Sequence, residues 1–277
     1  MANRIHWLQA QAQNSYCRGD DNLAVECRKR AIALLEEVGT EESLQSALDE
    51  RMRLGEMRAG LIETDSTVAE EQMGHYAIVA QRCRKQIEGR RDPDPRPCAL
   101  LALARIRMAI IRNKQGRGGE TARWAEEALD VLLTTGPWRP QLRCELRMAA
   151  YALAGDGLRR AGAAPVAALK HYEQAIACCR HYIESGYAMG DEVKIFSWDK
   201  PEWEKEPWKT ADEDPWPWRE CGQFDVVEMF RWIRGSLAEM AAVPANESTR
   251  QFIQRLEAEI DGWGIPRLPE AGPDNKS

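Results

Sequence analysis

The feature that most constrains this chain is a two-helix pattern that recurs along its first two thirds. Apolar residues return at intervals of three and four, for example at Leu101, Ala104, Met108 and Ile111, as they do on the buried face of an α-helix. Turn-forming residues interrupt these stretches at regular distances. The second helix of each pair is predicted to begin near Asp20, Ser66, Gly118 and Ala164, which is every 46 to 52 residues. Such repetition predicts an all-α fold, a superhelix of about four helical hairpins.

Composition agrees with a folded helical protein. Apolar residues make up 44% and charged residues 30% of the 277 residues, which is typical of globular chains. No run of 18 apolar residues occurs and the N-terminus lacks a signal-peptide pattern, so we expect no membrane span and a cytoplasmic location. In a reducing cytosol the eight cysteines are expected to be thiols.

The fourth unit resembles a known repeat family. Residues 149–177 read AAYALAGDGLRRAGAAPVAALKHYEQAIA, with a small residue in the first helix, a turn glycine, and then alanine, an aromatic residue and alanine in the second helix. This order resembles the tetratricopeptide repeat (TPR). The residues that would fill these positions are Gly157, Ala168, Tyr172 and Ala175.

The first unit shows the same order less completely. It offers Ala12, Gly19, Ala24 and Ala31, but Arg28 stands where the family has an aromatic residue. The resemblance covers residues 5–186, and the interval is longer than the family's usual period of about 34 residues. The same residue pattern also agrees with a plain helical bundle or with another α-solenoid.

Four segments are expected along the chain. Residues 1–189 form the TPR-like domain, and residues 190–222 form an acidic insertion rich in tryptophan and proline. Residues 223–264 contain two further helices, separated by a capping turn at Asn246 to Ser248, that are expected to cap the stack. Residues 265–277 are expected to be a flexible tail.

Motifs of catalysis are missing from the sequence. It contains no G-x-S-x-G, H-E-x-x-H, P-loop or G-x-G-x-x-G pattern, and only four histidines. Cys178, Cys179 and His181 come closest to a metal cluster but lack further ligands, so we expect core thiols. Asp20 and Asp21 are expected to cap a helix rather than to bind a metal. We therefore expect no enzymatic activity, metal or cofactor.

Arginines on the first helices form the candidate binding site. Resemblance to the TPR implies that first helices line a concave groove that binds peptides. Residues 82–147 carry a local charge of +7, although the whole chain has a net charge of −6. Guanidinium groups bind carboxylates through paired hydrogen bonds, which favours an acidic or carboxylate-bearing protein segment as the partner. The candidate groove residues are Arg51, Arg58, Arg105, Arg112, Arg143, Arg147 and Arg160.

Other interpretations of these arginines remain open. They are also explained as solvated residues paired locally with glutamates. A nucleic-acid partner is disfavoured because the chain is acidic overall and its aromatic residues avoid the basic region. An enzyme or a sensor of a small anionic ligand, with its pocket between the stack and the insertion, is the main alternative function. A third interpretation is a subunit of a larger complex.

The tryptophans of the insertion are expected to be buried. Five exposed indole rings would reduce solubility, so they need a surface to cover them. The segment, with a charge of −5 over residues 190–221, is expected to fill the basic groove, to pack as a simple loop, or to bind a partner. These tryptophans are Trp198, Trp203, Trp208, Trp216 and Trp218.

Overall fold

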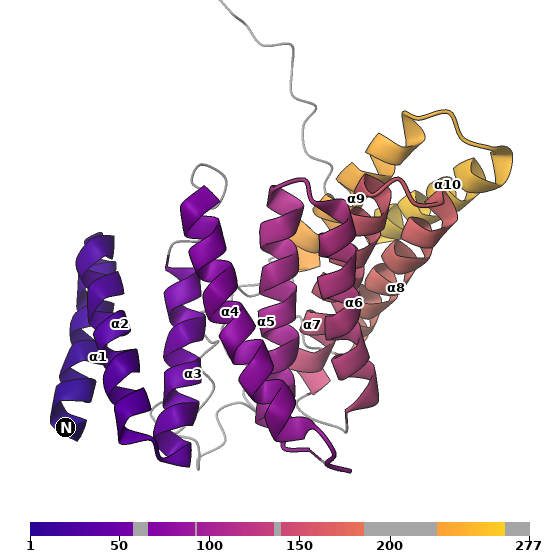
Figure 1. Cartoon of the computed structure of the whole chain (residues 1–277). Helices are drawn as coiled ribbons and strands as arrows, with labels where there is room; N and C mark the ends of the chain where they lie inside the picture. Colours follow the sequence, from indigo (N-terminus) through magenta and orange to yellow (C-terminus); the bar gives the residue numbers. More distant parts are fainter. Residues whose placement is uncertain (58–65, 92, 136–139, 186–225, 264–277) are drawn as a thin grey trace, which may run out of the picture.

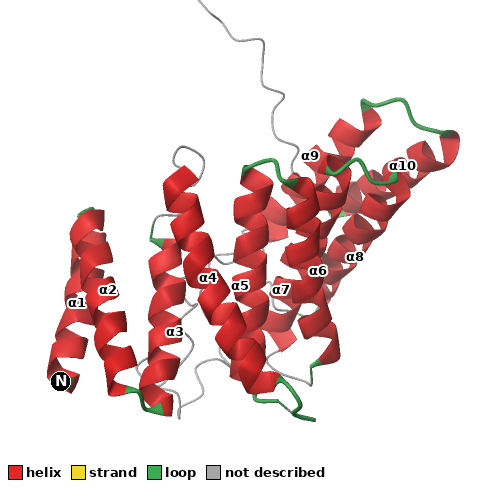
Figure 2. Ribbon diagram, in the orientation of Figure 1, coloured by secondary structure: helices red, strands yellow, loops and turns green. Residues whose placement is uncertain are grey.

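The computed structural model describes residues 1–57, 66–91, 93–135, 140–185 and 226–263. Within these ranges the chain forms ten helices and no strand, so the all-α prediction is confirmed (Figure 2). The predicted insertion, residues 190–222, and the predicted tail, residues 265–277, lie outside the described residues. The helices are α1 (Ala2–Cys17), α2 (Asp21–Val38), α3 (Glu41–Glu56), α4 (Ser66–Ile87), α5 (Pro95–Lys114), α6 (Gly118–Thr134), α7 (Pro140–Arg160), α8 (Pro165–Glu184), α9 (Val226–Ala241) and α10 (Glu247–Gly262).

The helices pack mainly on their neighbours in the chain. From α1 to α8 each helix contacts the next one, and α5 also contacts α7. Figure 1 shows the resulting row, which runs from α1 at one end to α8 at the other. Helix α9 packs on α7 and α8, and α10 packs on α8 and α9. Below, α1, α3, α5 and α7 are called the first helices, and α2, α4, α6 and α8 the second helices.

The helix boundaries follow the sequence signals closely. The second helices begin at Asp21, Ser66, Gly118 and Pro165, next to the predicted starts. The Asp20 carboxylate accepts a hydrogen bond from the Leu23 N–H at 3.1 Å, so its predicted capping role is confirmed. At the start of α10 the Asn246 side chain accepts the Thr249 N–H at 2.8 Å.

A continuous apolar core joins α3 to α10. It runs from Leu48 in α3 to Ile260 in α10 and includes the predicted buried stripes of α5 and α9. Helices α1 and α2 contribute only separate, smaller apolar clusters. Their junction with α3 is polar, because Arg28 of α2 and Glu50 of α3 form an ion pair and each is only 2% exposed. The N-terminal pair is therefore attached to the rest by charge as well as by apolar contact.

Three glycines bring helices close together, and one of them differs from its expected role. A Cβ on Gly155 would lie 2.6 Å from the Tyr172 ring, and one on Gly55 would lie 2.5 Å from the Tyr76 ring. Gly157, expected in the turn, lies inside α7, where a Cβ would meet the backbone of Ala122 at 2.4 Å. The turn is made instead by Gly162, whose φ of 73° favours glycine.

The buried carboxylate of Asp156 joins four helices. It lies in α7, is 1% exposed, and accepts hydrogen bonds from Tyr172 of α8 at 2.6 Å and from Asn113 of α5 at 3.3 Å. From α9 it accepts the Ser236 hydroxyl at 2.6 Å and the Trp232 indole N–H at 2.8 Å. Burial alone would raise the pKa of Asp156, but the hydrogen bonds from Ser236, Tyr172 and Trp232, together with the positive charge of Arg159, outweigh burial and lower it. A charged carboxylate thus anchors α9 to the stack.

Replacing Asp156 is expected to destabilise the protein strongly. The Asp156→Ala change leaves two buried hydroxyls, those of Tyr172 and Ser236, and the half-buried indole N–H of Trp232 without their acceptor, which should cost about 2–4 kcal/mol. The measurement is urea unfolding followed by circular dichroism, with Asp130→Ala on the exposed face of α6 as the control. Equal unfolding free energies for the two variants would contradict this account of α9.

Candidate functional site

The predicted groove arginines of the first helices reach towards the second helices. One guanidinium nitrogen of Arg51 in α3, Nη2, donates to both carboxylate oxygens of Glu36 in α2, at 3.0 and 3.1 Å. The other, Nη1, lies 3.3 Å from Nδ1 of His75 in α4. Its side chain is 13% exposed. Arg51 therefore sits between two successive second helices and is held there by a carboxylate of one of them.

Arg105 and Arg112 of α5 occupy the next interval in the same way. Arg105 forms an ion pair with Glu127 of α6 at 3.0 Å and lies 4.4 Å above the Trp124 ring. Arg112 binds Glu70 of α4 at 2.5 Å and Glu120 of α6 at 3.0 Å. The two arginines are 9% and 7% exposed. Both therefore connect helices of this chain, as the interpretation of local pairing with glutamates requires.

Arg143 and Arg147 of α7 enter the last interval, between α6 and α8, without such a partner. The Arg143 Nε donates to the Leu132 carbonyl of α6 at 2.8 Å. Arg147 lies 6.0 Å from the Tyr151 ring, which in turn lies 6.0 Å from the ring of His171 in α8. Both arginines are half-buried, and neither forms an ion pair with a carboxylate of the described residues. Within the described part of the chain, these two arginines therefore differ from Arg51, Arg105 and Arg112, which each bind a glutamate.

The remaining candidate residues are placed as follows. Arg160 is exposed and donates to the Asn113 carbonyl at 2.9 Å. Arg58 and the five tryptophans of the insertion lie outside the described residues, so the three roles considered for the insertion stay predictions. The carboxylate partners Glu36, Glu70, Glu120 and Glu127 were not expected individually. The sequence feature that could have identified them is the regular occurrence of glutamate on the second helices.

Two thiols, Cys144 and Cys178, lie within reach of the charge of Arg147, and the His171 ring lies beside Tyr151. Cys144 of α7 donates to the Cys178 carbonyl of α8 at 3.2 Å. A hydrogen bond with Cys144 and the positive charge of Arg147 lower the pKa of the Cys178 thiol, against the effect of burial. Burial lowers the pKa of His171, with Glu126 opposing the shift. At neutral pH His171 is therefore uncharged, and the arginines dominate the local charge.

No metal centre is found in the part of the chain that is described: it contains no group of three or more histidine, cysteine, aspartate or glutamate side chains arranged around an ion. Cys178 and Cys179 are buried in α8, whereas His181 is exposed. The seven described cysteines are thiols, as expected.

A half-buried carboxylate with a raised pKa lies at the junction of α3 and α5. Asp49 of α3 binds Arg96 at the start of α5. Burial raises the pKa of Asp49 to about 7, and the charges of Arg96 and Arg53 oppose this rise without overcoming it. The group therefore titrates near neutral pH, unlike an ordinary aspartate.

Removing Arg112 is expected to cost more stability than removing an exposed arginine that contacts the same glutamates. The Arg112→Ala change removes a buried side chain and its charge-assisted hydrogen bonds to Glu70 and Glu120, and should lower the unfolding free energy by about 1–3 kcal/mol. Arg117→Ala is the matched control, because Arg117 also contacts both glutamates but its side chain is 49% exposed. It should cost less than about 1 kcal/mol. The unfolding free energies are measured by urea unfolding. Equal losses of unfolding free energy in the two variants would refute the structural role of Arg112.

The pKa of Asp49 predicts a pH dependence with a definite sign. Between about pH 4 and pH 7 the folded protein retains a proton that the unfolded chain has lost, so this contribution to stability decreases as the pH rises through 7. The unfolding free energy of the parent protein, minus that of Asp49→Asn, should fall by up to about 1.4 kcal/mol per pH unit. Urea unfolding of both proteins between about pH 5 and pH 8 tests this. A pH-independent difference would show that Asp49 has no raised pKa.

Comparison of the chain with protein-family models, curated proteins and solved structures gave no match. The resemblance to the tetratricopeptide repeat therefore stays a prediction from the sequence. Among the helices that the structure describes, none has both the length and the apolar character needed to cross a membrane.

Proposed function

We propose that this protein is a TPR-like interaction module that binds a carboxylate-bearing segment of a partner protein at Arg143 and Arg147. The proposed site is the face of α7 that carries these two arginines and lies between α6 and α8. The proposal keeps the peptide partner and the cytoplasmic location that the sequence predicts, and it continues to disfavour a nucleic-acid partner. It narrows the binding site from seven candidate arginines to two. The alternative pocket between the stack and the insertion involves residues outside the described ranges.

The arrangement of the helices supports an interaction module. Each of the first eight helices contacts the next, and α9 and α10 pack at the α7–α8 end of the row. A row built in this way forms an extended surface, along which arginines of the first helices reach between successive second helices. Repeat proteins use such extended surfaces to bind other chains.

The observation that carries the proposal is a break in the pattern of ion pairs. In the intervals between α2 and α4 and between α4 and α6, the guanidinium groups of Arg51, Arg105 and Arg112 each hold a glutamate of a second helix. In the interval between α6 and α8, Arg143 and Arg147 hold no carboxylate of the described residues. A carboxylate from another protein would occupy the corresponding place.

The surroundings of the two arginines suit such a ligand. Arg143 and Arg147 are one helical turn apart on the same face of α7, so they present two guanidinium groups side by side. Both are half-buried, so water competes less for the guanidinium groups and a hydrogen bond to a carboxylate is stronger. The neighbouring rings of Tyr151 and His171 offer an apolar wall for the stem of an acidic side chain.

Charge reversal at these arginines is expected to abolish binding of an acidic peptide. The probe is a fluorescein-labelled peptide of glutamates, and binding is measured by fluorescence anisotropy at low salt. Arg143→Glu/Arg147→Glu should weaken the affinity at least about tenfold, because two charge-assisted hydrogen bonds are replaced by repulsion.

The matched control is Arg4→Glu/Arg18→Glu, which makes the same change of net charge at exposed positions on α1 and at its C-terminal end. It should bind nearly as tightly as the parent protein. Circular dichroism verifies folding, and Arg143→Gln/Arg147→Gln replaces the double glutamate variant if that variant unfolds. Equal losses of affinity in the two double variants would show that only net charge matters and would refute the site.

A further inference from the structure

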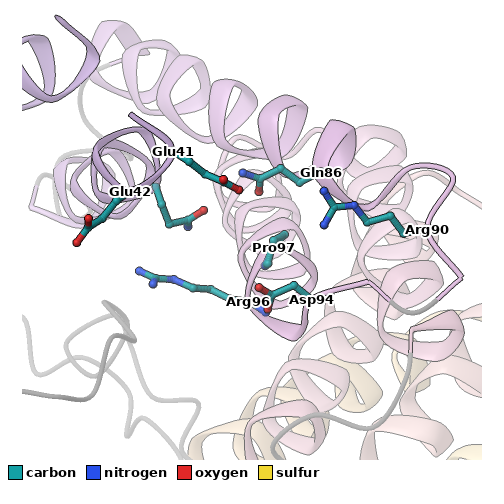
Figure 3. Close-up of a pocket in the computed structure, with 8 residues that line it drawn as sticks. Glu41, Glu42, Gln86, Arg90, Asp94, Arg96 and Pro97 are labelled. Carbon is teal, nitrogen blue, oxygen red and sulfur yellow. The ribbon is translucent and has the colours of Figure 1, made fainter. Parts of the chain in front are cut away.

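Helix α1 lacks one of the neighbours that the other first helices have. Each of α3, α5 and α7 packs between two second helices, whereas among the described helices only α2 packs extensively on α1. Figure 1 shows α1 at the end of the row, with the rest of the stack on one side of it. The pocket drawn in Figure 3 is lined by residues of α3, α4 and α5 and the loop between α4 and α5, so it lies farther along the row.

The side of α1 that faces away from the stack carries a regular seam of uncharged residues. Its members follow one another at steps of four and three, which is the spacing of the contact seam between two helices of a coiled coil. An outward helix face in contact with water alone normally carries charged residues. Below it is called the outer face of α1, and its residues, all exposed, are Asn3, Trp7, Ala10, Asn14 and Cys17.

Trp7 is the most unusual residue of the outer face. It is 61% exposed, whereas Trp124 and Trp232, in the body of the stack, are half-buried. The buried side of α1 is made by other residues, Ile5 and Leu8 among them, so Trp7 is not needed for packing within the chain. A large aromatic ring exposed on a helix seam is typical of an interaction surface.

Two copies of the outer face fit each other when they run antiparallel. In one register Trp7 of each copy lies opposite Cys17 of the other, and Ala10 lies opposite Asn14. Each large indole ring then meets a small thiol, and the small side chain of Ala10 lets the two helices approach closely. The residue sizes along the seam are therefore self-complementary in this register.

The charges at the two ends of α1 favour the same arrangement. Arg4 gives the start of the helix a positive charge, and no acidic residue stands in the first turn. The end of the helix is followed by Arg18, Asp20 and Asp21, which together carry one negative charge. An antiparallel pair brings the start of one helix next to the end of the other, so that opposite charges and opposite ends of the helix dipole meet.

We propose that two copies of this chain associate through the outer faces of their α1 helices, which pack antiparallel about a two-fold axis near residue 12. An uncharged seam between ends of opposite charge matches a second copy of itself better than it matches a strongly charged partner. A single helix from each copy makes a small interface, so the dissociation constant is expected in the micromolar range. The interface lies at the opposite end of the row from Arg143 and Arg147.

The test is sedimentation equilibrium of the full chain under reducing conditions, in which the parent protein should approach twice its mass of 31.4 kDa as its concentration rises. Trp7→Glu places a carboxylate in the seam and should raise the dissociation constant at least about tenfold. Val243→Glu is the matched control, because Val243 lies between α9 and α10, is apolar and is 62% exposed. It should associate as the parent protein does.

A mixture of two variants tests the antiparallel register. Trp7→Glu should associate more tightly with Cys17→Lys than with the parent protein, because the introduced carboxylate of one copy lies opposite the introduced ammonium group of the other. In a parallel pair the two positions are about 15 Å apart along the axis, so no such gain occurs. Circular dichroism verifies that each variant is folded.

The outcomes separate this proposal from the proposed function. Trp7→Glu should bind the acidic peptide as the parent protein does, and Arg143→Gln/Arg147→Gln should still dimerise. A parent protein that stays monomeric at high micromolar concentration would overturn the proposal, as would equal effects of Trp7→Glu and Val243→Glu. Failure of Cys17→Lys to improve the association of Trp7→Glu would overturn the antiparallel pairing.

Discussion

The interaction on which the stacking of these helices depends is the insertion of arginines from the first helices between successive second helices. Arg51 joins α3 to α2, and Arg112 joins α5 to both α4 and α6. A guanidinium group is suited to this position because its planar fork binds a carboxylate while its stem packs against apolar neighbours. Removing the glutamates would leave the guanidinium groups of Arg51 and Arg112, which are 13% and 9% exposed, without these partners, so the pairs oppose slippage of one helix along the next.

The two ends of the row are built differently. At the N-terminal end, α1 and α2 meet α3 through the buried pair of Arg28 and Glu50 and small apolar clusters. At the other end, the large core continues into α9 and α10, and Asp156 fixes α9 by accepting its hydroxyl and indole hydrogen bonds. We therefore expect local opening to begin at α1 and α2, because a polar junction loses less free energy than a continuous apolar core when water enters.

The sequence predicts the helices well because their signals are local. Periodicity identifies the buried stripes, and caps such as Asp20 locate the starts of helices to within about a residue. The sites are harder to predict because their partners are distant: Asp156 meets Ser236, 80 residues away. A spacing of seven places Arg105 and Arg112 on one face of α5, but it cannot say that this face meets α4 and α6. For the same reason Gly157 was expected in a turn, although its small size serves a contact with α6.

The central claim is that the arginines of the first helices differ in availability: those of α5 bind glutamates, and those of α7 bind no carboxylate among the described residues. Nuclear magnetic resonance of the arginine Nε–Hε groups, during titration with an acidic peptide, tests this claim directly. The account predicts that the Arg143 and Arg147 signals shift with the peptide while the Arg105 and Arg112 signals stay in place. Shifts of Arg105 and Arg112 as large as those of Arg147, or no shift of Arg147, would contradict it.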